Sequence, residues 1–360
     1  MKKPKKILII IQRSNGDVFL SLALINALYN NLHSPQIDLL VNDDTIAIAK
    51  LLPKINFIHT FSYKKKHEER WGQEKNLIKN IYRQYDLSIN LTASDRSVIY
   101  SILASNNSIS AIEKENYKSW WKKILLRHHY YFDTSKHILL NNLEPLRFLK
   151  IEQEAFLNAP NASKEAMDNV QKKLSILGIS DFIIFHPSAQ YKYKIYPQYL
   201  RDKLLSLLSN LGISIIVTGT NNKIDTEIKN TLPCVPNVVD LIGETSLEEC
   251  FALSSLSQAY IGMDTLNMHI AAAQNKHIFA IFGPTKLSMW APWSNQLEVS
   301  ATDDMAIQTY DNVTIFQADM PCVACGNSGC DNHGKSDCLY NISPELIFKA
   351  IEDWYKKITL

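Results

Sequence analysis

Short runs of β-branched and other apolar residues alternate with helix-like stretches along the chain, in two successive series. The first series opens with Lys6–Gln12 (KILIIIQ), a continuous apolar run typical of a parallel strand buried on both faces. The turn residues Ser14-Asn15-Gly16-Asp17 follow, and Val18–Tyr29 then has the apolar content of a buried helix. Gln36–Val41 and Tyr85–Leu91 are predicted to be further strands of this series.

A second series begins after Leu157–Ser163 (LNAPNAS), whose Asn, Pro and Ser residues are typical of a linker. Phe182–His186, Ile213–Thr218 and Ala259–Gly262 are predicted strands, and a helix-like stretch follows each of them. Two series of strand–helix units separated by a linker predict an α/β protein with two Rossmann-like, doubly wound domains.

The linker also gives the expected domain boundaries. A chain of 360 residues is longer than a single core usually holds. We expect one domain over residues 1–160, a second over 161–342, and a closing amphipathic helix over 343–360. Ligands of doubly wound sheets bind beyond the carboxyl ends of the strands, so two facing domains would leave a binding cleft between them.

The charged residues are unevenly divided. The formal net charge is +2, but residues 1–150 carry +10 and the remainder carries −8. The basic half is expected to meet something anionic, such as phosphate or a lipid surface, unless the imbalance is a chance property of the surface. Nucleic acid is disfavoured as the partner, because no recognised nucleic-acid module is present and the charges do not form one compact run.

The first residues imitate the start of a secretory signal. The apolar run after the initial lysines stops at Gln12-Arg13, however, and no small-residue cleavage site follows it. No stretch approaches the roughly 18 apolar residues that a membrane-spanning helix needs. The sequence therefore predicts a cytosolic protein with reduced cysteines.

The turn after the first predicted strand is the first candidate site. Gly16 would allow a tight turn there, and the start of the following helix favours a bound anion or a carboxylate. The Asp17 carboxylate could then act as a general base. Further glycines at the spacing of a dinucleotide fingerprint are absent. The alternative is that Asp17 simply caps the helix.

A second candidate follows the strand that ends at His186. Ser188, Ala189 and Lys194 bring a hydroxyl, backbone N–H groups and a positive charge to one strand–turn–helix unit. These are the groups that bind a diphosphate. Alternatively, Lys194 is an ordinary exposed lysine before the helix that begins near Pro197.

A third candidate follows the strand that ends at Gly262. Asp264 and Thr265 stand at the start of an alanine-rich helix, and His269 lies one turn after Thr265 on the same side. This arrangement could bind phosphate or sugar hydroxyls. The alternative is an ordinary cap with a histidine buried in the core.

Four cysteines near the carboxyl terminus form a C-x2-C-x4-C-x7-C cluster that encloses His333. Structural zinc on the four thiolates is one interpretation. Disulfides and reduced thiols are the alternatives, because the spacing departs from the usual two C-x2-C pairs. The cysteines of this cluster are Cys322, Cys325, Cys330 and Cys338.

Taken together and in order, these motifs resemble glycosyltransferase family 9, the ADP-heptose:lipopolysaccharide heptosyltransferases. The resemblance covers nearly the whole chain, and its most specific part is DLIGETSLEECFALSSLSQAYIGMDTLNMHIAAA followed by IFGPTKLSMWAPW. ILIIIQRSNGDVFLSLALINAL, YDLSINL and HPSAQYKYKIYP are similar to earlier family segments. The ending PCVACGNSGCDNHGKSDCL looks most like the heptosyltransferase III branch.

The resemblance implies a GT-B fold and an inverting transfer of heptose from ADP-heptose that needs no metal or other cofactor. Within the family's motif, Asp17 corresponds to the proposed general base. The residues that the resemblance places at the donor are Gly16, Ser188, Ala189, Lys194, Thr218, Gly219, Asp264, Thr265, Leu266, Asn267 and His269.

The family's acceptor is a phosphorylated lipopolysaccharide inner core, so the basic half would hold it. Lys64, Arg96 and Lys122 are the candidate contacts, together with the lysines that neighbour them in sequence (Lys65, Lys66 and Lys123). Trp120-Trp121 could touch the membrane surface. We therefore expect a peripheral protein at the cytoplasmic face of the inner membrane, with a plain solvated surface as the alternative for these side chains.

Two departures from the family pattern concern the donor. Leu266 stands where the family usually has glycine, which would matter if that position needs a positive φ. The segment after Gly219 (TNNKID) lacks an obvious acidic residue for a ribose immediately beyond the strand. A different nucleotide sugar, or a non-catalytic relative that only binds one, therefore remains as an alternative.

Overall fold

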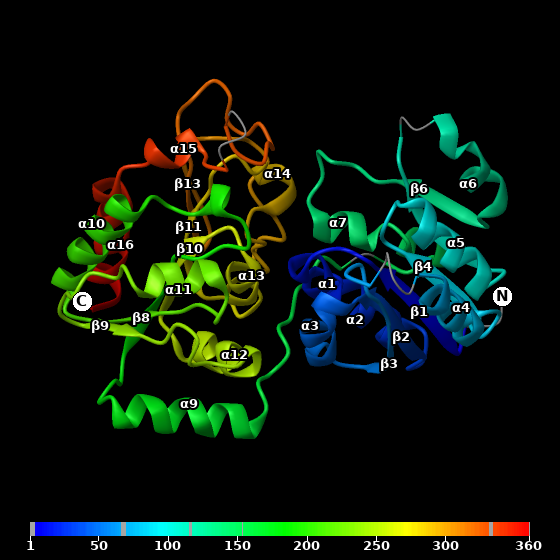
Figure 1. Ribbon diagram of the computed structural model, residues 1–360, viewed down its shortest axis with the longest axis horizontal. Helices are drawn as coiled ribbons and strands as arrows, with labels where there is room; N and C mark the ends of the chain where they lie inside the picture. Colours follow the sequence, from blue (N-terminus) through cyan, green and yellow to red (C-terminus); the bar gives the residue numbers. More distant parts are fainter. Residues whose placement is uncertain (1–3, 66–69, 115–116, 153, 331–333, 360) are drawn as a thin grey trace. The chain divides into compact units, whose positions relative to one another are not determined.

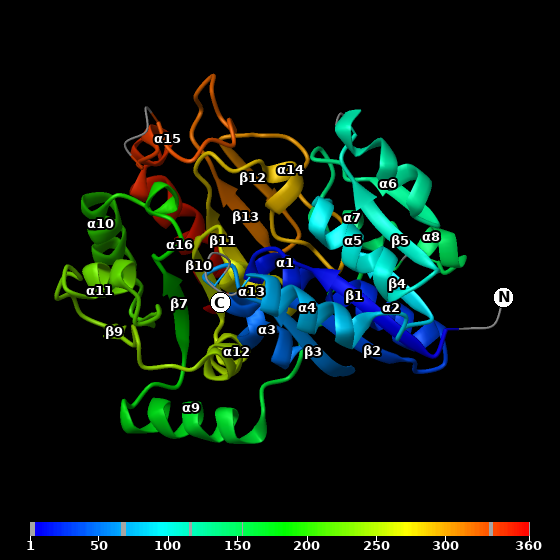
Figure 2. The same cartoon turned by 45° about the vertical axis from the view of Figure 1, so that its right-hand side comes forward.

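The computed structural model in Figure 1 describes residues 4–65, 70–114, 117–152, 154–330 and 334–359. The chain divides into two compact units, Met1–Pro160 and Asn161–Leu360. Each unit contains one sheet with helices on both of its faces, as Figures 1 and 2 show. The predicted α/β class with two doubly wound sheets is confirmed.

The sheet of the first unit is parallel throughout, with the strand order β3-β2-β1-β4-β5-β6. This is the order of a Rossmann sheet, and its direction of winding reverses between β1 and β4. The strands are β1 (Lys6–Ile11), β2 (Gln36–Asn42), β3 (Ile55–Phe61), β4 (Leu87–Asn90), β5 (Ser108–Ile112) and β6 (His128–Tyr131).

Burial explains the continuous apolar run of β1. This strand lies in the middle of the sheet, and Ile7–Ile11 are almost completely buried. The helices of the unit are α1 (Asn15–Leu20), α2 (Leu22–Asn31), α3 (Ile46–Leu51), α4 (Arg70–Ile81), α5 (Asp95–Ala104), α6 (Trp120–Leu125), α7 (Ile138–Leu143) and α8 (Leu146–Leu149). The helix predicted over Val18–Tyr29 thus starts earlier and is divided at Ser21.

The sheet of the second unit has seven strands in the order β12-β13-β11-β10-β7-β8-β9, and only the edge strand β12 is antiparallel to its neighbour. The winding reverses between β7 and β10. The strands are β7 (Phe182–His186), β8 (Ser214–Val217), β9 (Val238–Asp240), β10 (Ala259–Met263), β11 (His277–Ile281), β12 (Ile307–Tyr310) and β13 (Val313–Phe316).

Alternate residues of β7 pack against different helices, as expected for a central strand. Ile183 and Phe185 belong to one apolar cluster with α10 and α16, whereas Phe182 and Ile184 belong to another with α9, α12 and α13. The helices of this unit are α9 (Lys164–Ile176), α10 (Gln198–Leu208), α11 (Lys223–Lys229), α12 (Leu247–Leu256), α13 (Leu266–Ala273), α14 (Leu287–Trp290), α15 (Asp337–Tyr340) and α16 (Pro344–Thr359).

Gly262 allows β7 and β10 to approach closely. A Cβ atom at this position would lie 2.4 Å from the carbonyl oxygen of His186, which is backbone and cannot move aside cheaply. The close pairing brings the carboxyl ends of β7 and β10 together at the point where the sheet reverses. In doubly wound sheets this is where ligands bind.

Candidate functional site

Asp17 lies at the reversal point of the first sheet. It follows β1 and sits in the first turn of α1, where its carboxylate is almost completely buried. Oδ2 accepts hydrogen bonds from the hydroxyl of Ser14 at 2.6 Å and from the N–H of Ser14 at 3.2 Å. Asp17 therefore does cap the helix, and its carboxylate is held in a fixed orientation. Gly16 has no positive φ, so it does not form the tight turn that was expected to require glycine.

Arg13 is a partner of Asp17 that the sequence analysis missed. Its Nε lies 2.9 Å from Asp17 Oδ1, and its guanidinium stacks over the ring of Phe132 at 4.7 Å from the ring centre. The two side chains are four residues apart and joined across a turn, which is a common spacing for an ion pair. The contact with Arg13 fixes the second oxygen of the carboxylate, as Ser14 fixes the first.

The reversal point of the second sheet gathers three polar side chains from different elements. His186 ends β7, Thr218 follows β8, and Asn267 lies in the first turn of α13. His186 Nδ1 is 3.0 Å from the hydroxyl oxygen of Thr218, and the Asn267 amide nitrogen is 3.2 Å from the imidazole nitrogens. Burial lowers the pKa of His186, against the opposing effect of Asp225, so this imidazole is neutral at physiological pH.

Lys194 and Asp264 form an ion pair at the same end of the sheet. Lys194 Nζ lies 2.6 Å from Asp264 Oδ2, and both side chains are largely buried. Desolvation lowers the pKa of Lys194, but the carboxylate of Asp264 outweighs it, so the pKa lies above its ordinary value. Lys194 is thus a fixed positive charge and not an ordinary exposed lysine.

Thr265 and Leu266 begin α13 next to this ion pair. Thr265 occupies the N-cap position, and its hydroxyl is 3.3 Å from the hydroxyl of Tyr260. Leu266 has no positive φ and is the first residue of the helix. The backbone here therefore does not require glycine. The first N–H groups of α13, which have no acceptor within the helix, and the charge of Lys194 together suit an anionic group.

His269 is buried one turn further along α13. Its Nδ1 atom has no hydrogen-bond partner within the part of the chain that the structure describes. Burial lowers its pKa from 6.5 to about 4; Asp264 opposes this shift and Lys194 adds to it. His269 is therefore a neutral imidazole with an unused polar atom beside Asp264 and Lys194.

We expect this histidine to make stability depend on pH. The folded chain keeps His269 neutral down to about pH 4, whereas the unfolded chain protonates it below about 6.5. The unfolded state binds more protons in this window, so the free energy of unfolding falls as the pH falls from 6.5 to 4. Thermal unfolding of the native protein and of His269→Asn across this range measures the difference. Parallel curves for the two proteins would contradict the assignment.

Asp225 is the acidic residue that the sequence analysis did not find after β8. It is buried, near the start of α11, and its carboxylate accepts hydrogen bonds from the hydroxyls of Ser188 and Thr220 and from the amide of Asn222. A Cβ atom on Gly219 would lie 3.3 Å from it, so glycine leaves it room. The Ser188 hydroxyl proton is therefore already used within the protein.

The second unit thus holds the Lys194–Asp264 ion pair beside the start of α13 at its reversal point, and the first unit holds the oriented Asp17 carboxylate at its own reversal point. The sequence profile of glycosyltransferase family 9 (heptosyltransferase) matches residues 75–317, which is more than half of the chain. The chain belongs to glycosyltransferase family 9. The predicted family is thereby confirmed, and the protein is a glycosyltransferase.

Individual relatives agree with this assignment. Lipopolysaccharide heptosyltransferase 3 of Escherichia coli is 28% identical over 295 residues, which cover 79% of this chain and 85% of the relative. A family 9 glycosyltransferase from Veillonella parvula superposes with a TM-score of 0.76 at 16% identity, covering 99% of each chain. The E. coli ADP-heptose lipopolysaccharide heptosyltransferase II gives 0.70 at 18% identity, covering 99% and 100%. The GT-B fold is confirmed.

The acceptor candidates of this family 9 enzyme lie in different settings. Lys64 is exposed in the loop after β3. The guanidinium of Arg96 stacks over the rings of Phe61 and Tyr63, at 4.4 and 5.2 Å from their centres, and its Nε is 3.5 Å from Glu74. Arg96 Nη1 is buried and makes no hydrogen bond to any residue that the structure describes. Lys66 lies outside the described residues.

Lys122 is not placed to contact an acceptor. Its side chain is completely buried, and its ammonium group lies 2.7 Å from the carbonyl oxygen of Ala93, 2.7 Å from Glu113 and 2.8 Å from Asp95. These oxygens occupy all of its hydrogen-bonding capacity. The prediction from sequence is wrong here because a lysine in a basic run was taken for a surface residue. Lys122 instead ties α6 to the start of α5 and the end of β5.

We expect Lys122→Ala to lower the free energy of unfolding by about 1–3 kcal/mol, because it removes a buried donor from three acceptors. Lys122→Met, which keeps the apolar stem, should cost less. Urea unfolding measures both. The neighbouring exposed residue provides the matched control, since Lys123→Ala should change stability by no more than about 0.5 kcal/mol. Equal losses at the two positions would contradict this role of Lys122.

The cysteine cluster does not form a ligand set in the described residues. Cys322 and Cys325 are exposed, Cys338 is buried, and all are free thiols. Burial raises the pKa of the Cys338 thiol to about 11, and the other three cysteines add to the shift. His333 lies outside the described residues. The zinc site stays a prediction.

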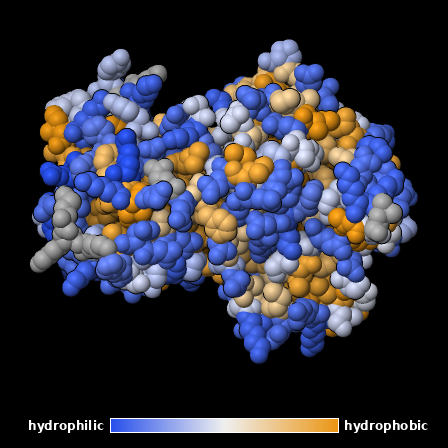
Figure 3. Space-filling view, turned by 180° about the vertical axis from the view of Figure 1, so that it is seen from behind, coloured by the Kyte–Doolittle hydropathy of each residue, from blue (hydrophilic) through white to orange (hydrophobic). Residues whose placement is uncertain are grey.

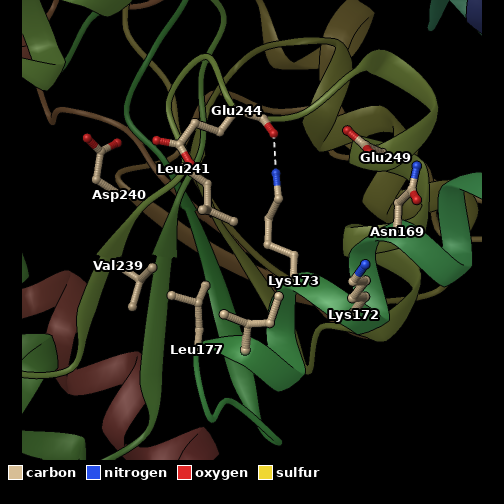
Figure 4. Close-up of a pocket in the computed structure, with 10 residues that line it drawn as sticks. Asn169, Lys172, Lys173, Leu177, Val239, Asp240, Leu241, Glu244 and Glu249 are labelled. Atoms are coloured by element: carbon tan, nitrogen blue, oxygen red, sulfur yellow. Dashed lines mark hydrogen bonds between the residues drawn. The ribbon is translucent and has the colours of Figure 1, made fainter.

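A separate pocket of about 410 Å³ lies between α9 and the end of β9 (Figure 4). Lys173, Leu177, Val239 and Leu241 are among its lining residues, and Lys173 Nζ donates a hydrogen bond to the carbonyl oxygen of Glu244. None of the residues predicted for the donor lines this pocket. It is therefore distinct from the cluster of Lys194, Asp264 and His269 at the reversal point.

Proposed function

We propose that this glycosyltransferase moves heptose from ADP-heptose to a phosphorylated sugar of a lipopolysaccharide inner core, with inversion at the anomeric carbon. The observation that carries the proposal is the Lys194–Asp264 pair at the start of α13, at the reversal point of the second sheet. A fixed cation beside free backbone N–H groups suits the diphosphate of a nucleotide sugar. The names of the E. coli relatives support heptose and lipopolysaccharide as the transferred sugar and its destination.

Asp17 is the proposed general base. Inversion requires an acceptor hydroxyl to attack the anomeric carbon from the face opposite the leaving group. As the new C–O bond forms, the Asp17 carboxylate takes the hydroxyl proton. Its Oδ2 is held by Ser14 and its Oδ1 by Arg13, so the carboxylate keeps one orientation. A fixed base avoids the entropy cost of orienting a free one.

We propose that the second unit stabilises the ADP that leaves. When the bond between the anomeric carbon and the β-phosphate oxygen breaks, negative charge grows on the diphosphate. Lys194 and the N–H groups that begin α13 would stabilise this charge, which is why we propose that transfer needs no metal ion or other cofactor. Thr218, Gly219, Asn267 and the neutral His269 complete the proposed donor contacts, with Ser188 and Ala189 acting through their backbone groups.

The acceptor is proposed to bind the first unit through Lys64 and Arg96. The exposed part of the Arg96 guanidinium, whose side chain is 18% exposed, and the exposed Lys64 would meet phosphate groups of the inner core. In the described residues no helix is both long and apolar enough to span a bilayer. Because the acceptor is anchored in lipid, we propose a peripheral location at the cytoplasmic face of the inner membrane.

A donor panel tests the proposal. The purified protein is incubated with several nucleotide sugars and a heptose-containing lipid A–core acceptor, and released nucleotide is measured. ADP release that requires both ADP-heptose and the acceptor is the expected result. Turnover of another donor would overturn the proposed sugar, and binding of ADP-heptose without release on any core acceptor would favour a non-catalytic relative.

A further inference from the structure

Helix α6 and the short turn before it, Tyr117–Ser119, carry large apolar side chains that face water. Tyr117, Trp120, Ile124 and Leu125 are 94%, 64%, 68% and 57% exposed. Exposed apolar residues are common singly, but four within nine positions of one short segment form a patch that monomeric proteins rarely leave uncovered. Figure 3, which shows the face behind that of Figure 1, has a mainly hydrophilic surface with several separate apolar areas.

The opposite side of α6 is firmly fixed to the unit. Trp121 packs against a buried cluster formed by Val98, Ile112 and Leu126. Lys122 is completely buried among three oxygen acceptors. Of the two adjacent tryptophans, one therefore anchors the helix and the other points outward. The outer side chains are not needed to hold α6 in place, so their apolar character calls for a different explanation.

Basic residues surround these apolar side chains. Lys118 and Lys123 are exposed within the same segment, and the nearby Lys114 and Arg127 are exposed as well. Two neighbouring carboxylates, Asp95 and Glu113, are both paired with the buried Lys122. The combination of outward apolar side chains with exposed cations is what binds the headgroup region of an anionic bilayer. A protein partner would not by itself require this excess of positive charge.

We propose that the α6 surface, formed by Tyr117, Lys118, Trp120, Lys123, Ile124 and Leu125, inserts into the interface of an anionic phospholipid bilayer. The choice of occupant rests on the proposed function, because a transferase with a lipid-anchored acceptor must work at a membrane. The position in the fold agrees, since α6 follows the carboxyl end of β5, the sheet edge at which Asp17 also lies. Insertion here would present that edge to the lipid layer.

Sedimentation of the full chain with vesicles tests this surface. The vesicles contain phosphatidylcholine alone or mixed with phosphatidylglycerol. We expect binding to the anionic vesicles only, weakened by salt. Ile124→Glu should weaken it at least roughly tenfold, and Lys123→Ala about fivefold. The matched control is Ile176→Glu, which changes an equally exposed isoleucine in the second unit (76% exposed) and should leave binding unchanged.

Each other outcome contradicts the proposal. Equal binding of Ile124→Glu and the native protein would remove α6 as the membrane contact. In a second outcome, the native protein does not bind vesicles and is a dimer, whereas Ile124→Glu is a monomer. The surface would then be an interface between copies of the chain. Unfolding midpoints of the variants show whether they fold. Vesicle binding is measured without donor or acceptor, so its failure is distinct from a failure of heptose transfer.

Discussion

Asp17→Asn is expected to lower the turnover of heptose transfer by about 10²–10⁴-fold, because the amide cannot accept the proton of the attacking hydroxyl. Asparagine matches the shape of aspartate, and its carbonyl oxygen can still accept the hydrogen bonds from Ser14. The helix start should therefore remain intact, and binding of ADP-heptose should hardly change. Release of ADP under saturating donor and acceptor measures the loss.

The control for Asp17 is another carboxylate at the carboxyl ends of the strands of the first sheet, away from the reversal point. Asp44 follows β2 and is exposed, so Asp44→Asn should keep native turnover. Native activity in Asp17→Asn would remove Asp17 as the base.

Lys194→Met is expected to reduce turnover by about 10²–10³-fold, the usual cost of removing one preorganised group that stabilises developing negative charge. The loss should appear mainly in kcat, because the charge on the leaving diphosphate grows as the bond breaks. Steady-state kinetics of ADP release measures kcat and KM separately. The neighbouring Lys192 pairs with the exposed Glu227 away from Asp264, so Lys192→Met is the matched control and should retain turnover.

A second variant separates chemistry from stability at this position. Lys194→Met leaves the largely buried Asp264 carboxylate without its cation, so the protein should also lose stability. Adding Asp264→Asn removes that unpaired charge and should restore the unfolding midpoint without restoring turnover. If the double variant regains native kcat, Lys194 acts only as the partner of Asp264 and does not stabilise the leaving group.

The central strands of both sheets were predictable because burial on both faces demands continuous apolar runs. Lys6–Ile11 and Phe182–His186 meet that demand and appear as β1 and β7. The outer strands were not predictable in the same way. His128–Tyr131 and Ile55–Phe61 lie at the edges of the first sheet, where polar and half-buried residues are tolerated, so they lack the continuous apolar run of the central strands.

The candidate site was predictable in its residues but not in its pairings. The turns after β1, β7 and β10 carry Asp17, Lys194 and Asp264 as expected. Nothing in the order of residues shows that Lys194 meets Asp264 seventy positions away, since the pairing depends on the neighbouring placement of β7 and β10. Likewise, Asp225 lies several positions after β8, and only the turn of the chain before α11 brings it to Ser188.

Asp225 has a consequence for any attempt to change the donor. Its carboxylate accepts hydrogen bonds from Ser188 in the loop after β7 and from Thr220 and Asn222 in the loop after β8. The conformations of the two loops are therefore coupled. Substitutions in them will not act independently: each will alter the hydrogen bonds available to the others, and their free-energy effects will not add. New sugar specificity should therefore be sought in libraries that vary Asp225, Ser188, Thr220 and Asn222 together. Single substitutions at these positions would mostly disrupt the shared hydrogen bonds and give inactive variants.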